Sequence, residues 1–270
     1  MASIVFFHAH PDDESIATGG TMAGLAADGH EVVLVVATGG EHGEAPPDLA
    51  GGETLADRRR VETERSAALL GASALHWLDY HDSGMTGWSQ NDDPRAFVRA
   101  DLDEAARRLA DILIAHQATV LTCYDWHGNY GHPDHVKVHH VGHRAAALAG
   151  TPIVYEATMN RDHIVRLMKM AREAGDSLRR PNGDDAEFDP NDTDDGNPFG
   201  LAETELTTAI DVRAFIDVKR ASMASHASQI GDSSFFLQMP PEQFAMAFGT
   251  EWYRRVGAPS GIQESRLAGL

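Results

Sequence analysis

The sequence predicts an α/β fold, with a mostly parallel sheet, helices on both faces and a small C-terminal α+β cap. Two patterns indicate this fold. Short apolar segments alternate with helical segments up to Asn160, and glycines stand where the helices should end. After Asn160 the alternation stops. We therefore expect one domain over residues 1–270, with a Rossmann-like core over residues 1–160 and a cap over residues 161–270.

The expected strands are short, continuous and rich in Val, Leu, Ile or Phe, which is typical of strands buried on both faces. In chain order they are Ser3–His8, Glu31–Thr38, Leu75–Leu78, Thr119–Tyr124 and Ile153–Thr158. A further segment in the cap, Thr204–Val212, alternates between polar and apolar residues and is predicted to be an edge strand.

The expected helices lie between these strands, and several are closed by a glycine. The first follows Thr18 as a candidate cap and ends near Gly29, and later helices are expected at Leu55–Leu70, His135–Ala149 and Arg213–Ala224. Another helix is predicted from apolar residues at helical spacing, namely Val98, Leu102, Ala105, Leu109, Ile112 and Leu113.

Composition limits the function classes. The net charge is −19, with 41 acidic against 22 basic residues. This balance argues against nucleic acid or an anionic membrane as the main partner, and it fits a small neutral or cationic substrate or a bound metal. The early apolar run Ile4–Phe7 is too short for a signal or membrane segment, and the single Cys123 excludes an internal disulfide. We expect a cytoplasmic protein, and a homo-oligomer is left open.

The first chemical signal directly follows the first predicted strand. Residues 8–14 contain two histidines and three acids, and Pro11 should keep them in a loop where their side chains spread apart. Burying these polar and charged side chains costs free energy unless they are solvated or bind a positive ion, and a divalent metal is such an ion. A helix-capping acidic loop is the alternative, but it explains one aspartate and not the imidazoles.

The second signal follows the strand Thr119–Tyr124 and repeats the order His-Pro-Asp at His132–Asp134. The carboxyl ends of parallel strands meet at one edge of a sheet, so the two loops should lie together. Two imidazoles and a carboxylate can form a catalytic zinc site with one position left for water. His135, His139 and His143 are one helical turn apart, so spacing leaves open which of them binds. Packing or support of a ligand is the alternative role for His139, His140 and His143.

Together, His-Pro-Asp-Asp-Glu at residues 10–14 and Gly-His-Pro-Asp-His at residues 131–135 resemble the LmbE-like/PIG-L family of zinc-dependent N-deacetylases. Its actinobacterial branch includes the mycothiol-pathway deacetylase and the mycothiol conjugate amidase. The resemblance runs from Ser3 into the C-terminal region and is weaker over residues 160–200. It implies one Zn²⁺ per chain, held by His10, Asp13 and His135.

The resemblance also implies roles for other residues. Asp12 matches the general base, and His132 and Tyr130 match groups that stabilise the oxyanion or polarise the amide carbonyl, with Asp134 orienting His132. Substrate contacts are implied in three loops. They are Glu44 after the second strand, Arg59 in an Arg-x-x-Glu pattern with Glu62, and Asp82 and Met85 in Asp-Ser-Gly-Met. The segment 225–229 resembles the family's C-terminal His/Gln segment. A turn or a solvated helix face is the alternative for each of these substrate-loop and C-terminal matches.

The implied reaction removes an N-acyl group by hydrolysis from a small molecule that contains N-acetylglucosamine. The acyl group expected is acetyl. Alternatives within the family are a mycothiol S-conjugate-type amidase and a deacetylase of a secondary metabolite. His127 and Asn129 depart from the residues that related deacetylases often carry, and the acidic loop 175–200 and Trp252-Tyr253 have no match. These departures lie where substrate contacts are expected, so the substrate itself stays open.

Three hypotheses from other functional classes compete with a deacetylase. A non-catalytic metal- or sugar-binding module is disfavoured because the base, Asp12, is present. A metal-dependent phosphoesterase would need more bridging carboxylates and a basic cluster near the motifs. A cysteine-nucleophile hydrolase is disfavoured because Cys123 lies within an apolar strand, where an inert core thiol is expected.

Overall fold

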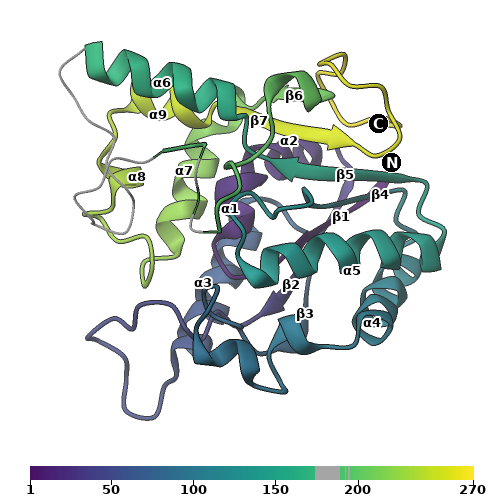
Figure 1. Cartoon of the computed structure of the whole chain (residues 1–270), viewed down its shortest axis with the longest axis vertical. Helices are drawn as coiled ribbons and strands as arrows, with labels where there is room; N and C mark the ends of the chain where they lie inside the picture. The colour runs from purple at the N-terminus through teal and green to yellow at the C-terminus, as the bar shows by residue number, and fades with distance from the viewer. Residues whose placement is uncertain (174–188, 192, 194) are drawn as a thin grey trace.

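The computed structural model describes residues 1–173, 189–191, 193 and 195–270, so most of the predicted acidic loop 175–200 lies outside the described residues. The described chain contains one sheet with the strand order β3-β2-β1-β4-β5-β7-β6 (Figure 1). The strands are β1 (Ser3–His8), β2 (Glu31–Thr38), β3 (Ala74–Tyr80), β4 (Val120–Tyr124), β5 (Ile153–Thr158), β6 (Thr208–Asp211) and β7 (Thr250–Arg255).

The first five strands run parallel, which confirms the predicted fold class. The chain builds the sheet outward from β1 through β2 to β3 and then returns to place β4 on the free edge of β1. The strand order therefore reverses between β1 and β4, whose register pairs Ile4 with Val120. Loops that follow the two strands at such a switch point border a crevice where a ligand can bind.

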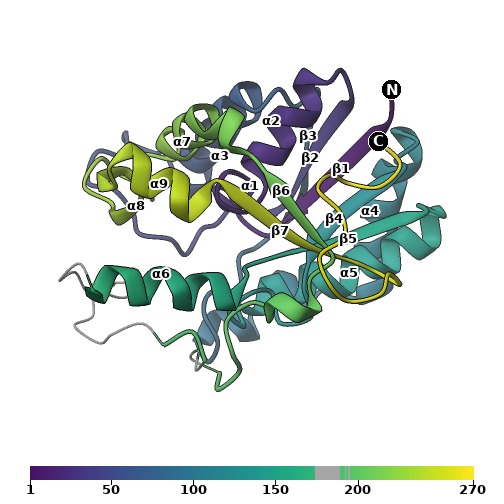
Figure 2. The same ribbon diagram turned by 90° about the horizontal axis from the view of Figure 1, so that it is seen from above.

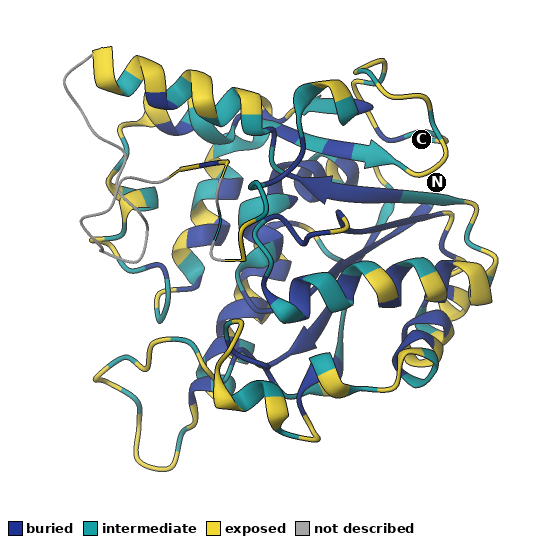
Figure 3. Ribbon diagram, in the orientation of Figure 1, coloured by how far each residue is buried: buried dark blue, intermediate teal, exposed yellow. Residues whose placement is uncertain are grey.

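Helices cover both faces of the sheet (Figure 2). In the described part of the chain they are α1 (Asp13–Ala17), α2 (Gly19–Ala27), α3 (Leu55–Leu69), α4 (Leu102–Ala115), α5 (Pro133–Ala149), α6 (Arg161–Glu173), α7 (Ile216–Ser225), α8 (Phe235–Gln238) and α9 (Pro241–Phe248). Helices α4 and α5 pack together on one face, and α2, α3 and α7 lie on the other. All six residues of β1 are buried, because this strand has a partner on each edge and helices on each face (Figure 3).

Two helices, α1 and α4, begin at residues other than those predicted. Helix α1 begins at Asp13, so the predicted loop is shorter than expected and Asp13 stands in the first helical turn. The predicted helix that included Val98 begins only at Leu102, and Val98 lies in a separate 3₁₀ turn. Thr18 precedes α2 as expected, but its hydroxyl contacts His8 Nε2 at 2.9 Å and makes no capping bond.

The C-terminal segment extends the sheet as well as covering it. Strand β7 was not expected, and it pairs antiparallel with β5 and with β6. The predicted edge strand 204–212 is confirmed as β6, although it starts at Thr208 after a 3₁₀ turn. Helix α7 begins at Ile216, slightly later than predicted, and packs against α2 and α3. None of the helices in the described ranges combines the length and apolarity that crossing a bilayer requires.

Candidate metal and active site

The first motif joins β1 to α1 through an unusual backbone turn. Asp12 has φ of 88°, in the left-handed region, and this turn lets the strand pass directly into the helix. The turn is tied to the helix because the backbone N–H of His10 donates to Asp13 Oδ2 at 2.9 Å. His10 is 8% exposed, so the motif presents an imidazole and two carboxylates at a nearly closed end of the sheet.

The second motif forms the start of α5. His132 is the residue before the helix, and its Nδ1 accepts the backbone N–H of Asp134 at 3.1 Å. Pro133 fits the first helical position, where no backbone donor is needed. Gly128 lies in the left-handed region with φ of 60°, and a Cβ there would overlap the Cβ of His135. The motif therefore requires glycine at position 128 to let the loop fold over His135.

The two motifs bring three acceptor atoms together, as their order along the sheet predicts. His10 Nδ1 lies 3.3 Å from His135 Nε2. Asp13 Oδ2 lies 3.6 Å from His10 Nδ1 and 3.4 Å from His135 Nε2. Tetrahedral zinc with bonds of about 2.0–2.1 Å places neighbouring ligand atoms roughly 3.3–3.4 Å apart. The three atoms therefore have the spacing that such an ion requires.

Hydrogen bonds behind the imidazoles show that their lone pairs face this point. His10 Nε2 lies 3.1 Å from Asp134 Oδ2, and His135 Nδ1 lies 3.2 Å from the carbonyl oxygen of Gly128. Both oxygens accept, so in the neutral rings that bind a metal the imidazole protons lie on those outer nitrogens. Two lone pairs and the Asp13 carboxylate then meet with no donor between them. A cation resolves this repulsion, so these residues fit a metal.

Carboxylates beyond the imidazoles add to the negative charge. Asp82 Oδ1 lies 3.5 Å from His10 Nε2, and the other Asp82 oxygen accepts the backbone N–H of His42 at 3.1 Å. Burial by itself would lower the pKa of His10, but Asp82, Asp13 and Asp134 raise it well above its usual value. The site thus stabilises positive charge, whether a proton or an ion.

Asp12 lies beside these residues with a side chain that is 18% exposed. Burial raises the pKa of Asp12 to about 6, with Arg59 opposing the rise and Asp13 adding to it. Arg59 Nη2 lies 3.2 Å from Asp12 Oδ2. A carboxylate with a pKa close to neutrality is well suited to accept and return a proton.

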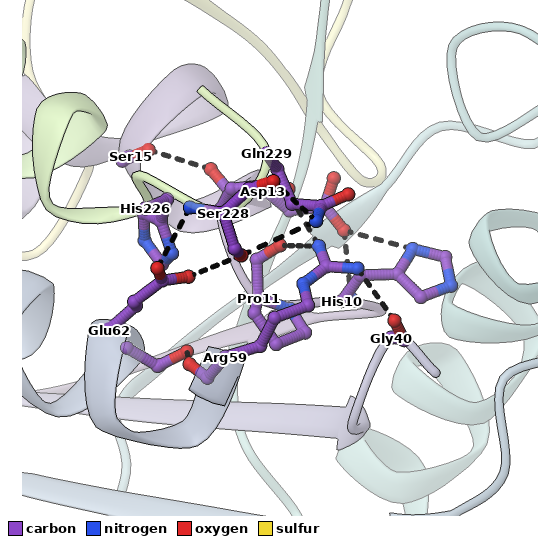
Figure 4. A network of polar contacts seen from close by, with 12 residues as sticks. His10, Pro11, Asp13, Ser15, Gly40, Arg59, Glu62, His226, Ser228 and Gln229 are labelled. Carbon is purple, nitrogen blue, oxygen red and sulfur yellow. Dashed lines mark hydrogen bonds and ion pairs between the residues drawn. The ribbon is translucent and has the colours of Figure 1, made fainter. Parts of the chain in front are cut away.

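The guanidinium of Arg59 faces inward, where it positions the first motif (Figure 4). Arg59 is 5% exposed and donates to the carbonyl oxygens of Gly40 at 2.8 Å and Pro11 at 2.5 Å. Glu62, its expected alternative partner, instead accepts from the backbone and the hydroxyl of Ser228, at 2.8 and 2.6 Å. The buried position of Arg59 rules out the alternative of a solvated helix face, and its predicted contact with a sugar stays a prediction.

His132 is buried and Tyr130 is half-buried, and the rings of both lie beside the ring of His135. Because His132 Nδ1 accepts a backbone N–H, the neutral ring carries its proton on Nε2. Burial and the neighbouring His10 and His135 hold the pKa of His132 well below its usual value. The Tyr130 ring is 5.0 Å from the His135 ring, and burial and Asp13 raise the pKa of the Tyr130 hydroxyl. Both groups are therefore neutral donors.

The other expected site residues fall into two groups. The Asp134 carboxylate accepts from the backbone and the hydroxyl of Ser83 and faces His10, whereas the sequence predicted that it orients His132. Asp82 is likewise buried beside His10. Glu44 is exposed and Met85 is half-buried, so these two predicted substrate residues remain accessible.

Comparisons with known proteins decide the family. Residues 5–146 match the family model described as GlcNAc-PI de-N-acetylase, PIG-L. The chain is 36% identical to 1D-myo-inositol 2-acetamido-2-deoxy-alpha-D-glucopyranoside deacetylase of Thermomonospora curvata, across 99% of this chain and 95% of that protein. The chain belongs to the PIG-L family.

Two solved structures share the fold of this PIG-L family chain. N,N'-diacetylchitobiose deacetylase from Pyrococcus horikoshii has a TM-score of 0.60 at 22% identity, covering 94% of this chain and 83% of that one. The 4-carboxy-2-hydroxymuconate hydratase GalB from Pseudomonas putida has a TM-score of 0.56 at 18% identity, covering 96% and 97%. One fold thus carries two chemistries, so the site and the family, not the fold, indicate hydrolysis.

The family match also confirms that the chain is a metal-dependent type of N-deacetylase with a His/Asp site able to hold an ion. His10 takes part in two further groups of nearby ligand atoms, one with His132 and His135 and one with Asp82 and Asp134. The set of His10, Asp13 and His135 is the one that the resemblance implies, and its three ligand atoms lie 3.3–3.6 Å from one another.

Sequence reasoning missed the supporting residues of this PIG-L site. Glu14 is fully buried and accepts from His226 Nε2 at 2.7 Å, from the hydroxyl of Ser66 and from the Asp12 backbone N–H at 3.0 Å. Gln229 bonds both backbone groups of Glu44, at 3.2 and 2.8 Å. The signal was present in the C-terminal His/Gln segment, but its partners are far away along the chain.

Proposed function

We propose that this chain hydrolyses the acetamide of an N-acetylglucosamine unit in a small molecule, with one Zn²⁺ held by His10, Asp13 and His135. The observation that carries the proposal is that two imidazole nitrogens and one carboxylate oxygen lie 3.3–3.6 Å from one another. A second carboxylate, that of Asp12, lies beside them and is not one of the three ligands. Zinc in such a site supplies Lewis acidity towards a water molecule and the amide carbonyl.

Asp12 serves as the base in this proposal. It is ionised at neutral pH and accepts a proton from the attacking water, since its pKa of about 6 lies just below neutrality. The same proton then passes from Asp12 to the leaving amine. His132 is less suited to that step, because burial holds its pKa well below the usual value and the ring keeps its single proton on Nε2.

His132 and Tyr130 stabilise the charge that develops on the amide oxygen. Each is a neutral donor beside His135, and burial keeps the Tyr130 hydroxyl protonated by raising its pKa. Donors fixed in place before the reaction cost no reorganisation when charge appears, and one such donor contributes about 100- to 1,000-fold in rate.

The proposed substrate class follows from the relatives and the accessible residues. The relative at 36% identity is named for a deacetylase of an inositol glycoside of N-acetylglucosamine, so this glycoside is the first substrate to test. Glu44 and Met85 follow β2 and β3 and remain available for substrate contact. Arg59 and Asp82 are proposed to position Asp12 and His10 instead of binding sugar.

The test is release of primary amine and acetate from 1D-myo-inositol 2-acetamido-2-deoxy-α-D-glucopyranoside by the zinc-loaded chain. We expect turnover that is lost in His10→Ala together with bound zinc, and retained in His140→Ala, an exposed histidine on α5. Faster cleavage of a thiol-conjugate amide would favour the amidase alternative. No amine release from any N-acetylglucosaminide by zinc-loaded protein would refute the proposal.

A further inference from the structure

A second group of metal-ligating side chains lies on the same helix as His135, farther along α5. His139 and His143 are four residues apart on one face, and their rings are 4.3 Å apart. Opposite them, β5 presents Glu156, a fully buried carboxylate. Glu156 Oε1 lies 2.9 Å from His143 Nε2 and 3.4 Å from His139 Nδ1. One ligand atom from each residue lies within 4.8 Å of the other two.

We propose that His139, His143 and Glu156 form a second binding site for a divalent transition-metal ion such as Zn²⁺. Two imidazole nitrogens with one carboxylate oxygen are a recurrent zinc ligand set, which leaves a coordination position for water. The chemistry required is that of the ion alone, so the site does not depend on the proposed deacetylase function. It uses none of the residues of the first site.

Outer contacts hold the ligands in place, as they do in established metal sites. The Arg254 guanidinium on β7 donates through Nε to Glu156 Oε2 at 2.5 Å, and the other oxygen of Glu156 remains directed at the histidines. His139 Nδ1 lies 3.0 Å from the backbone carbonyl oxygen of Tyr124, which can only accept a proton. This bond fixes the orientation of the His139 ring beside Glu156, and an ion bound there would displace the protons that the two imidazoles share with the carboxylate.

The site is open enough for an ion to enter. The side chain of His143 is 32% exposed and that of His139 is 15% exposed, whereas Glu156 is closed off beneath them. A buried carboxylate bound only by hydrogen bonds from two histidines and Arg254 is the competing explanation. It differs in one measurable respect, because it predicts no bound ion.

The test counts ions per chain after equilibrium dialysis of the whole protein against zinc, with metal measured by elemental analysis. We expect two ions in the natural sequence and one in His143→Gln, because glutamine can keep the hydrogen bond to Glu156 but is a poor zinc ligand. His140→Ala is the matched control on the same helix and should keep two ions. His10→Ala should keep one ion, which separates the second site from the first.

A single ion in the natural sequence, or two ions in folded His143→Gln, would overturn the proposal. A second measurement uses the His10→Ala background. Zinc should raise its melting temperature, and His143→Gln added to His10→Ala should abolish that shift. A shift that survives both substitutions would show binding elsewhere and would equally overturn the assignment.

Discussion

Replacing Arg59 by methionine should move the acidic limb of the pH–rate profile to higher pH. Arg59 Nη2 is 3.2 Å from Asp12 Oδ2, and this cation opposes the burial that raises the pKa of Asp12 to about 6. Without the cation the pKa of Asp12 rises further. The base must be ionised to accept a proton, so kcat/KM begins to fall at a higher pH than in the natural enzyme.

The distance between the two charges sets the size of the shift. Two unit charges 3.2 Å apart interact by about 1.3 kcal/mol at a dielectric constant of 80 and by about 5 kcal/mol at 20. One pKa unit corresponds to about 1.4 kcal/mol. The acidic limb should therefore move up by about one to four pH units. A bound metal lowers the pKa of Asp12 in both proteins, so the difference between them remains.

The assay is kcat/KM between pH 5 and 9 with zinc content measured in parallel. Arg59→Lys keeps the positive charge and should move the limb less. The control is Arg60→Met, which removes a half-exposed arginine of the same helix that pairs with Asp79 on β3 and should leave the limb in place. Arg59→Met leaves the carbonyls of Pro11 and Gly40 without this donor, so folding is checked at each pH. An unmoved acidic limb in a folded, zinc-loaded Arg59→Met protein would refute the reasoning.

Three further substitutions probe the site. Asp12→Ala should keep bound zinc and lose about 100- to 10,000-fold in kcat, and loss of zinc instead would make Asp12 a ligand. Tyr130→Phe should lower kcat by about 100- to 1,000-fold at constant zinc content; an unchanged kcat would remove Tyr130 from the mechanism. Gly128→Ala should lower both the melting temperature and zinc retention, because its Cβ overlaps His135 at φ of 60°. A natural melting temperature and zinc content in this variant would contradict the proposed need for glycine.

The parts of the site that could be predicted from the sequence are those that follow a strand directly. The loops after β1 and β4 are adjacent because those strands are neighbours, so the meeting of His10, Asp13 and His135 follows from the order of the sheet. Most strands were predictable for a related reason. The central strands are buried on both faces, and burial requires an unbroken apolar sequence.

The direction in which a polar side chain points was not predictable. Arg59 and Asp82 are in segments that match substrate loops, yet both side chains face inward to backbone groups and to Asp12 or His10. Their partners come from other loops, and no local pattern records those contacts. Strand β7 was missed for a comparable reason, since Thr250–Arg255 mixes half-buried and buried positions at the antiparallel side of the sheet and has no unbroken apolar run.

The C-terminal third acts on the catalytic motif without supplying any of the three metal-facing atoms. Asp12 is held at φ of 88°, and a non-glycine residue in a rarely populated conformation costs about 1–3 kcal/mol unless its surroundings stabilise it. Its side chain is held by Arg59, and its backbone N–H donates to Glu14, which in turn accepts from His226 next to the end of α7. The position of Asp12, the proposed base, therefore depends on the docking of α7, which explains why a segment so far along the chain is built around buried polar contacts to the first motif.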